Sequence, residues 1–394
     1  MGLFGKSSND NIGLFNDCFP PVMDGVSVCV QNYAYWLQKK VGGVCVVTPH
    51  NHGVKYHEDY KVLDYMSVPV PFRRPYVTGI AEIDPAFVKK ILHRKFKIVH
   101  AHCPFASGTC AQRVAELQKV PMVATFHSKY RDDFARVIPS KFAVDQIIRQ
   151  IISFYEKADQ VWVPQASVED VIRDYGFKGE VQVVDNGCDL CADYDDEFFV
   201  KAREALGIKP DEFVMLFVGQ HIWEKNNQLI LDALALAKDV PFRMFYVGTG
   251  YAAEEMKSIV KAAGLEDKVT FAGVVTDRQK LTQYYAAADL FLFPSLYDNA
   301  PLVVREAAAL HTPSVMAKGA TASTIIIDGK NGFLVDNDPK DLAKTIEFLS
   351  RDKQLVHTAG LEASHTIVRS WENVVDEVLL RYNDLIASKK LIHL

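Results

Sequence analysis

Features that would place the chain across a membrane, on nucleic acid or in a disulfide framework are missing from the sequence. No run of about 18 apolar residues occurs in the 394 residues, so we expect no membrane-spanning helix. The start, MGLFGKSSNDN, turns polar at once and has Lys6 where a myristoylation motif needs Ser or Thr. The net charge of -5 argues against nucleic acid as a partner. We therefore expect a cytoplasmic protein without a signal peptide.

Cysteine is also scarce and unpatterned. The seven cysteines are an odd number and most lie inside apolar runs, which is typical of reduced thiols in a core. Cys188 and Cys191 form a single CxxC, but no second Cys or His pair follows at zinc-site spacing. Asp193-Tyr-Asp195 has the form of a DxD metal motif, yet it lies in a turn-rich stretch. The sequence therefore predicts no metal site.

The composition is that of a globular protein with two cores. Hydrophobic residues make up 49% and charged residues 24%, and the length suits two domains. The acidic balance is uneven, because the first half carries a basic excess. Its densest cluster is Lys89, Lys90, Arg94, Lys95 and Lys97.

Short apolar runs rich in Val, Ile and Phe alternate with stretches of helical spacing. The runs are 12–16, 44–49, 97–102, 122–127, 161–164 and 181–185, then 213–219, 243–248, 269–272, 290–294 and 314–317. The helical stretches include 28–39, 106–117, 227–237, 253–263 and 281–288. Continuous apolar strands that alternate with helices predict an α/β protein with doubly wound parallel sheets.

The alternation is interrupted once, at the acidic and turn-rich segment 185–197, which we interpret as a hinge. We expect domains at 1–188 and 189–371, with an amphipathic last helix at about 372–394 that packs back on the first domain. Ligands of open α/β sheets bind at the carboxyl ends of the strands. Functional residues are therefore expected on the loops that follow strands.

One such loop carries two acids. Asp298 follows the strand that ends near Pro294, and Glu306 lies in the first turns of a helix that begins near Pro301. Backbone N–H groups at a helix start bind anions, and a carboxylate can accept hydrogen bonds from a ribose diol. Two solvated acids favoured by the helix dipole would have the same spacing. Spacing alone leaves both interpretations open.

The segment resembles the acidic E-x7-E motif of retaining family-4 glycosyltransferases, with Asp298 in place of the first Glu. The segments 312–319 and 328–335 also fit that family, and Asn186-Gly-Cys-Asp189 resembles its interdomain NGVD element. The resemblance spans roughly residues 11 to 385. It implies the GT-B fold, which has two Rossmann-like domains, an interdomain cleft and a C-terminal crossover helix. The first domain would bind the acceptor and the second the nucleotide-sugar.

The family's phosphate loop corresponds to Gly219-Gln-His-Ile-Trp-Glu-Lys225. By resemblance, Lys225 neutralises the donor diphosphate; taken alone, it would be an exposed lysine at a helix start. Gln220 stands where the family has Arg, and Thr324 where many relatives have Glu. An amide lacks the charge and the two-pronged hydrogen bonding of a guanidinium, so these departures bear on donor affinity.

Two further loops in the first half resemble family elements. Asp24 and Gly25 lie in a loop that would touch donor phosphate and acceptor, although its usual second Gly is absent and a plain turn is the alternative. His127 matches a histidine beside the transferred sugar, and its alternative is a core histidine. His102 is the weaker candidate.

The resemblance thus implies a complete set of site residues. We expect His127 and Asp298 to act in catalysis. Donor contacts are expected from Gly25, Gly219, Gln220, Lys225, Asn299, Ala300, Pro301, Leu302 and Glu306. Acceptor contacts are expected from Asp24, His102, Lys129 and Tyr130. No cofactor or metal is expected, because Lys225 and helix N-termini can stabilise the leaving diphosphate.

The resemblance implies transfer of a hexose from a nucleotide-sugar to a hydroxyl acceptor, with retention at the anomeric carbon. The family further implies that the nucleotide is UDP. Residues 100–136 resemble the branch that glycosylates lipids such as diacylglycerol. The basic and apolar stretches 71–76, 89–97 and 127–154 could touch an anionic lipid surface, but from these residues alone solvated charge on ordinary helices is the preferred interpretation. We expect peripheral attachment to the inner face of the cell membrane. A GT-B-fold sugar-nucleotide epimerase and a non-catalytic nucleotide-sugar binding protein remain as alternatives.

Overall fold

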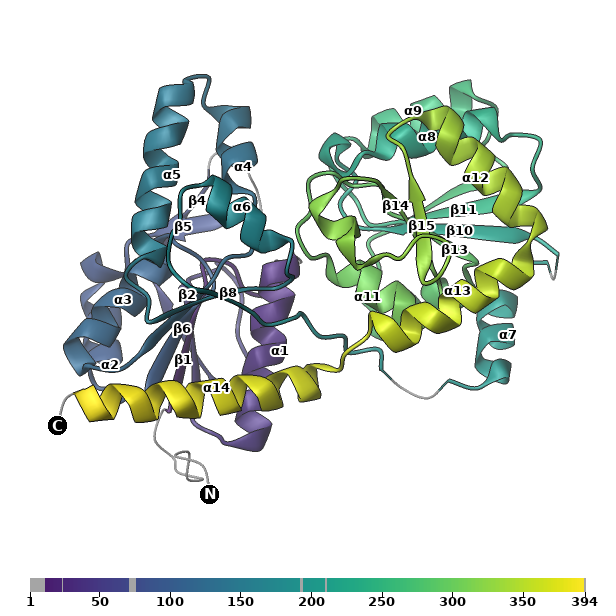
Figure 1. Cartoon of the computed structure of the whole chain (residues 1–394). Helices are drawn as coiled ribbons and strands as arrows, with labels where there is room; N and C mark the ends of the chain where they lie inside the picture. The colour runs from purple at the N-terminus through teal and green to yellow at the C-terminus, as the bar shows by residue number, and fades with distance from the viewer. Residues whose placement is uncertain (1–10, 23, 71–75, 192–193, 210, 393–394) are drawn as a thin grey trace. The chain divides into compact units, whose positions relative to one another are not determined.

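The structure is a computed structural model that describes residues 11–22, 24–70, 76–191, 194–209 and 211–392. The chain divides into two compact units (Figure 1). The first unit comprises residues 1–187 and 371–394, and the second comprises residues 188–370. The boundaries expected from the sequence differ from these by one residue.

The first unit contains a seven-stranded sheet with the order β3-β2-β1-β6-β7-β8-β9, in which every neighbouring pair is parallel. The strands β1, β2, β6 and β7 are buried along their whole length, as their continuous apolar sequences predict. The strand bounds are β1 Ile12–Phe15, β2 Val44–Pro49, β3 Lys61–Tyr65, β6 Ile98–Ala101, β7 Met122–Thr125, β8 Gln160–Val163 and β9 Val181–Val183.

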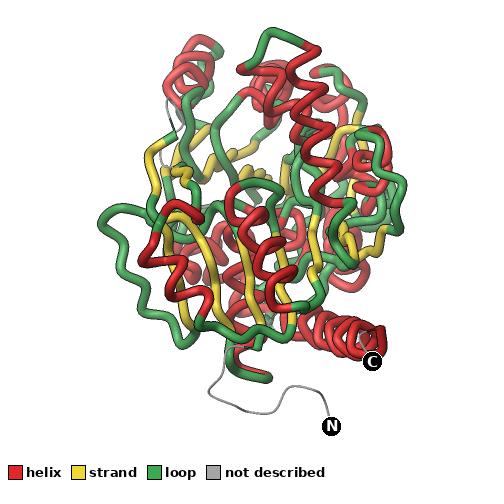
Figure 2. Tube along the Cα trace, turned by 90° about the vertical axis from the view of Figure 1, so that its left-hand side faces the viewer, coloured by secondary structure: helices red, strands yellow, loops and turns green. Residues whose placement is uncertain are grey.

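Helices lie against the sheet of the first unit, as the red and yellow segments of Figure 2 show. They are α1 Gly25–Lys40, α2 Pro85–Leu92, α3 Ala106–Gln118, α4 Tyr130–Val137, α5 Lys141–Tyr155 and α6 Val168–Asp174. A small antiparallel pair, β4 Ser67–Pro69 and β5 Val77–Gly79, and the short helix η1 Ala81–Ile83 complete the described elements before residue 187.

The second unit contains a six-stranded parallel sheet with the order β12-β11-β10-β13-β14-β15. Its strands are β10 Phe213–Val218, β11 Phe242–Val247, β12 Val269–Gly273, β13 Leu290–Leu292, β14 Ser314–Ala317 and β15 Gly332–Val335. Its helices are α7 Asp196–Ala205, η2 Trp223–Lys225, α8 Asn227–Leu236, α9 Ala253–Ala262, α10 Arg278–Ala287, α11 Leu302–Ala309, η3 Thr321–Ile325, α12 Pro339–Arg351 and α13 Lys353–Thr366. The two sheets confirm the predicted α/β class with two Rossmann-like domains.

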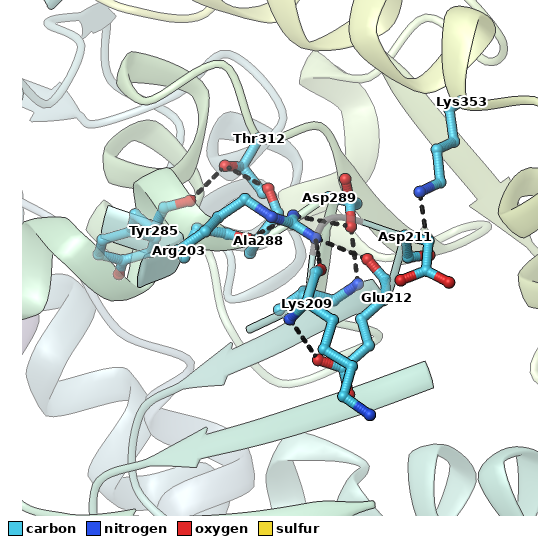
Figure 3. Close-up of polar contacts among 11 residues, drawn as sticks. Arg203, Lys209, Asp211, Glu212, Tyr285, Ala288, Asp289, Thr312 and Lys353 are labelled. Carbon is cyan, nitrogen blue, oxygen red and sulfur yellow. Dashed lines mark hydrogen bonds and ion pairs between the residues drawn. The ribbon is translucent and has the colours of Figure 1, made fainter. Parts of the chain in front are cut away.

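The helix α7 follows the predicted hinge and is tied to the second sheet by one arginine. Arg203 donates to the carbonyl oxygens of Ala287 at 3.0 Å and Glu212 at 2.6 Å, and it pairs with Asp289 at 3.3 Å. The Asp289 carboxylate also accepts from the Val214 N–H at 2.7 Å (Figure 3). This network ties α7 and the loop before β13 to the start of β10.

The last helix, α14 Trp371–Ile392, belongs to the first unit. The Tyr382 ring stacks on Trp162 with 5.7 Å between ring centroids, and its hydroxyl lies 2.6 Å from His100 Nδ1. Trp371 is fully buried beside Tyr33. These aromatic contacts explain why a segment so distant in sequence packs on β6 and β8. Among the described helices, none combines the length and apolar content that crossing a bilayer requires.

Candidate functional site

The loop between β13 and α11 holds Asp298 in an ion pair. Its Oδ1 lies 2.6 Å from Lys225 Nζ, and its Oδ2 accepts from Ser295 Oγ at 2.6 Å. The side chains of Lys225 and Asp298 are only 15% and 16% exposed. The interpretations of Asp298 as a solvated acid and of Lys225 as an exposed lysine are therefore wrong. The pair joins the loops that follow the neighbouring strands β10 and β13.

Glu306 is buried on the first turns of α11 and is held at both oxygens. Its Oε1 accepts from Arg278 Nη2 at 3.0 Å, and its Oε2 accepts from the Tyr285 hydroxyl at 2.7 Å. Arg278 also pairs with Asp189, the acid of the predicted Asn186–Asp189 element. Burial opposes the charge of Arg278, but Glu306 and Asp189 hold its pKa above the ordinary value. Glu306 is thus a positioned carboxylate and not a solvated one.

Arg278 and Tyr285 were not predicted from the sequence. Both lie on α10, which has the spacing of an ordinary amphipathic helix and carries no motif. Burial, and then the neighbouring Glu306, raise the pKa of Tyr285, so its hydroxyl stays a proton donor to the carboxylate. Only the three-dimensional position of α10 beside α11 identifies the two residues.

The loop after β10 is shaped by two glycines. Gly219 has φ +152° and Gly248 has φ +127°, and a Cβ on Gly248 would lie 2.0 Å from the Gly219 carbonyl oxygen. The absence of a side chain at Gly248 therefore lets the loop after β11 approach the loop after β10 closely. Asn226, with φ +60°, donates its side-chain N–H to the Pro294 carbonyl at 3.0 Å. Lys225 is thereby held against the loop of Asp298.

The other expected donor residues of the second unit lie around this pair. Gln220 is exposed. Asn299 and Pro301 are buried, whereas Ala300 and Leu302 are half-buried, directly before and at the start of α11. The structure thus brings the expected donor residues of the second unit together at the carboxyl edge of one sheet.

In the first unit, Asp24 caps α1. Its carboxylate accepts from the Ser27 N–H at 2.7 Å, which is the N-cap geometry of a helix start. Gly25 is the first helical residue, and no protein atom lies within 4 Å of where its Cβ would be. A residue at this position other than Gly would therefore occupy space that the chain itself leaves open.

His127 lies just after β7 and next to two other histidines. His102 Nδ1 lies 3.1 Å from His127 Nε2, and His100 stacks on His102 with 4.0 Å between ring centroids. Burial lowers the pKa of His127 to about 3 and the pKa values of His100 and His102 well below their ordinary value. The cluster is therefore made of neutral imidazoles, and His127 is its half-exposed member.

The remaining acceptor candidates differ in their surroundings. Lys129 is half-buried and precedes α4. Tyr130 is 5% exposed, contacts the rings of Phe105 and Phe126, and lies 3.4 Å from the Tyr155 hydroxyl. The Tyr130 ring is therefore part of the core of the first unit, and its contact with an acceptor stays a prediction.

The DxD-like stretch has a structural role where it is described. Asp193 lies outside the described residues, and Asp195 caps α7 by accepting from the Phe198 N–H at 2.9 Å. Cys191 Sγ lies 3.4 Å from the Cys188 carbonyl oxygen, and both thiols are free. Among the residues that the structure describes, neither stretch contributes to a group of three metal-ligating side chains.

Comparison with known proteins agrees with this architecture. The family model described as "Glycosyltransferase Family 4" matches residues 23–191, and the one described as "Glycosyl transferases group 1" matches residues 199–365. The chain is 25% identical to alpha-monoglucosyldiacylglycerol synthase of Streptococcus pneumoniae over 85% of this chain and 77% of that protein. It is 24% identical to the enzyme of the same name from Acholeplasma laidlawii, over 89% and 91% of the two chains.

Solved structures share the fold at lower identity. Sucrose-phosphate synthase from Thermosynechococcus elongatus superimposes with a TM-score of 0.81 at 21% identity over 96% of this chain and 100% of that one. Anabaena HepE in complex with UDP and glucose has a TM-score of 0.74 at 19% identity, over 98% and 100%. The fold and the matches define a glycosyltransferase with the GT-B fold. Within that class the chain belongs to family 4 and is a hexosyltransferase.

The neutral histidines make the first unit sensitive to acid. The folded state keeps His100 neutral, whereas the unfolded chain takes up a proton below pH ~6.5. Stability present above that pH is therefore lost as the pH falls, by about 1.4 kcal/mol per pH unit for each such group. His100→Gln should reduce the slope of unfolding free energy against pH by about 1.4 kcal/mol per unit between about pH 6 and 4.5.

Chemical denaturation of the first unit at a series of pH values measures this slope. Above about pH 7, the wild-type and His100→Gln curves should run parallel, because the unfolded histidine is then neutral as well. Equal slopes below pH ~6 would show that His100 is protonated in the folded protein.

Proposed function

We propose that this glycosyltransferase moves a hexose from a UDP-sugar, with retention at the anomeric carbon, to a hydroxyl of a membrane lipid. The observation that carries the donor half is the Lys225–Asp298 ion pair, together with the buried Glu306 on the helix that follows the Asp298 loop. It supplies a cation for a diphosphate, a carboxylate for a sugar and a second carboxylate for a ribose. The named complexes of HepE with UDP and with UDP-glucose support the choice of uridine nucleotide.

At the phosphate end, Lys225 and the backbone N–H groups at the start of α11 would share the developing charge of the leaving diphosphate. Donor binding would exchange part of the contact with Asp298 for a contact with phosphate. Gln220 adds a neutral hydrogen-bond donor and no charge. We therefore assign the stabilisation of the leaving diphosphate mainly to Lys225. The proposed reaction uses no metal ion or other cofactor.

At the sugar end, Asp298 would contact a hydroxyl of the transferred hexose, and His127 would bind the sugar as a neutral imidazole. The low pKa of about 3 supports this role, since burial keeps His127 uncharged at neutral pH. No described carboxylate stands out as a nucleophile for a covalent intermediate. We infer front-face transfer, in which the leaving phosphate accepts the proton of the acceptor hydroxyl.

For the acceptor, the names of the two diacylglycerol-glucosylating relatives support a lipid. Helices α4 and α5 project beyond the sheet of the first unit (Figure 1). Exposed apolar side chains lie next to basic ones around their connection. Val137 is 62% and Phe142 71% exposed, beside Arg136 and Lys141. An apolar tip flanked by cations suits the headgroup region of an anionic membrane.

The other basic stretches contribute less to this proposal. Lys89, Lys90 and Lys95 are exposed, but they lie on and after α2, at the opposite end of the first unit in Figure 1. Residues 71–75 of the predicted basic loop lie outside the described residues. We therefore propose that the α4–α5 connection attaches the enzyme peripherally to the inner face of the cell membrane.

Replacing Lys225 by Ala should weaken UDP binding about 10- to 100-fold, the equivalent of one hydrogen bond to a charged group. The physical reason is twofold, because the variant removes a cation and leaves Asp298 uncompensated near the diphosphate. Calorimetric titration with UDP measures the change. Lys330→Ala, which removes a lysine that pairs with Glu362 at 58% exposure, is the matched control and should bind normally. An unchanged dissociation constant for Lys225→Ala would remove Lys225 from the site.

Incubating the full chain with UDP-sugars, with and without vesicles that contain diacylglycerol and anionic phospholipid, tests the reaction itself. We expect UDP release that depends on the vesicles and a glycolipid product with the anomeric configuration of the donor. An isomerised UDP-sugar would indicate the epimerase instead. Binding without turnover would indicate a non-catalytic protein, and inversion at the anomeric carbon would contradict the proposed mechanism.

A further inference from the structure

Three side chains from separate segments of the first unit form a compact set of nitrogen and sulfur ligands. Cys29 comes from α1, His102 follows β6 and His127 follows β7. The Cys29 sulfur and one ring nitrogen of each histidine all lie within 4.8 Å of one another. Cys29 and His102 are buried, and His127 is half-buried, so the set has a dry base and one accessible member.

His102 also carries one ring nitrogen that has no hydrogen-bond partner among the described residues. His102 is 1% exposed, and its Nε2 is buried without a hydrogen bond, while its Nδ1 faces His127. A buried polar atom without a partner costs about 1–3 kcal/mol, so native structures rarely leave one unused. The stacked His100 and the Tyr33 ring, at 5.3 Å between centroids, hold His102 in this orientation.

The ligand chemistry is that of zinc and related cations. Neutral imidazoles are the ligating form of histidine, and burial keeps His102 and His127 in that form. Burial raises the pKa of the Cys29 thiol, so binding would release one proton from Cys29 to solvent as the sulfur–metal bond forms. Ligand atoms on a tetrahedral zinc ion lie about 3.3–3.7 Å apart. The three ligand atoms here lie within 4.8 Å of one another, so metal binding needs side-chain shifts of about 1 Å.

We propose that Cys29, His102 and His127 form a reversible binding site for a soft divalent cation of the zinc type, and that its occupation stops sugar transfer. Three protein ligands leave the fourth position of a tetrahedral ion to water. The inhibitory half rests on the proposed function, because it follows from withdrawing His127 from the sugar. The binding half stands on the geometry alone.

The sequence does not predict this set of ligands, because positions 29, 102 and 127 do not have the spacing of a metal-binding motif. It is also separate from the CxxC of Cys188 and Cys191, which belongs to the second unit. A metal held by that pair instead would keep its thiolate ligand in a variant that lacks Cys29. Substitution at Cys29 therefore distinguishes the two locations.

Cobalt titration of the chelator-treated full chain tests the binding half without any measurement of activity. We expect one Co²⁺ per chain, with thiolate-to-cobalt charge-transfer absorption and the visible bands of a tetrahedral site, both abolished by stoichiometric Zn²⁺. Cys29→Ser should lose the charge-transfer band and at least about 100-fold in affinity, because even groups that only support a ligand contribute 10–100-fold. Cys110→Ser, another buried cysteine of the first unit, is the matched control and should keep both.

His102→Gln provides a second variant, should Cys29→Ser not fold, and it too should lose cobalt binding. Absence of the charge-transfer band in the wild type, or its persistence in Cys29→Ser, would overturn the site. In the transfer assay, Zn²⁺ should inhibit the wild type and Cys110→Ser but not Cys29→Ser, whose activity without zinc should be retained. Equal inhibition of all three would overturn the regulatory half, whereas a wild type inactive without zinc would contradict the proposed function and leave the spectroscopic result intact.

Discussion

The ion pair between Lys225 and Asp298 is the interaction on which the candidate donor site depends. Lys225 Nζ lies 2.6 Å from Asp298 Oδ1, and both side chains are largely shielded from water. The pair joins the loops that follow two neighbouring parallel strands. Removing one partner of such a pair leaves the other charge without compensation, which costs far more than an exposed pair gains. The pair therefore orders both loops before any substrate arrives, and in the proposed function Lys225 faces the diphosphate and Asp298 the sugar.

The other buried charges of the second unit's candidate site are also compensated by neighbouring groups. Glu306 is fixed by Arg278 and Tyr285, and Arg278 is fixed in turn by Asp189, so that each buried charge has an opposite charge or a donor. A carboxylate oxygen has more than one acceptor position, so Glu306 can still receive ribose hydroxyls. The histidine cluster of the first unit differs from these paired charges, because burial keeps its imidazoles uncharged. A neutral cluster can bind a sugar hydroxyl without attracting the diphosphate, and it can also bind a metal ion.

The sequence predicted most of the fold, because the central strands are continuous apolar runs and the helices between them are regular. The edge strand β3 was missed, since Lys61 and Asp64 interrupt its pattern, and the edge strand β15 was missed because it begins at Gly332 directly after a turn. The short antiparallel pair of β4 and β5 was not predicted either. The loops with Asp298 and Lys225 were found because functional residues follow strands in this fold class. Arg278 and Tyr285 were not, because their helix carries no motif. The burial of Tyr130 could not be read from the sequence either, because it depends on the rings of Phe105 and Phe126 from other segments.

The central claim is that a nucleotide-sugar binds at the carboxyl edge of the sheet in the second unit. Hydrogen exchange of the full chain with and without saturating UDP tests it most directly, because phosphate and ribose contacts protect the backbone amides that they order. The account predicts slower exchange in residues 219–227 and 295–306, the two loops joined by Lys225 and Asp298. Unchanged exchange in both loops, or protection confined to the first unit, would contradict it.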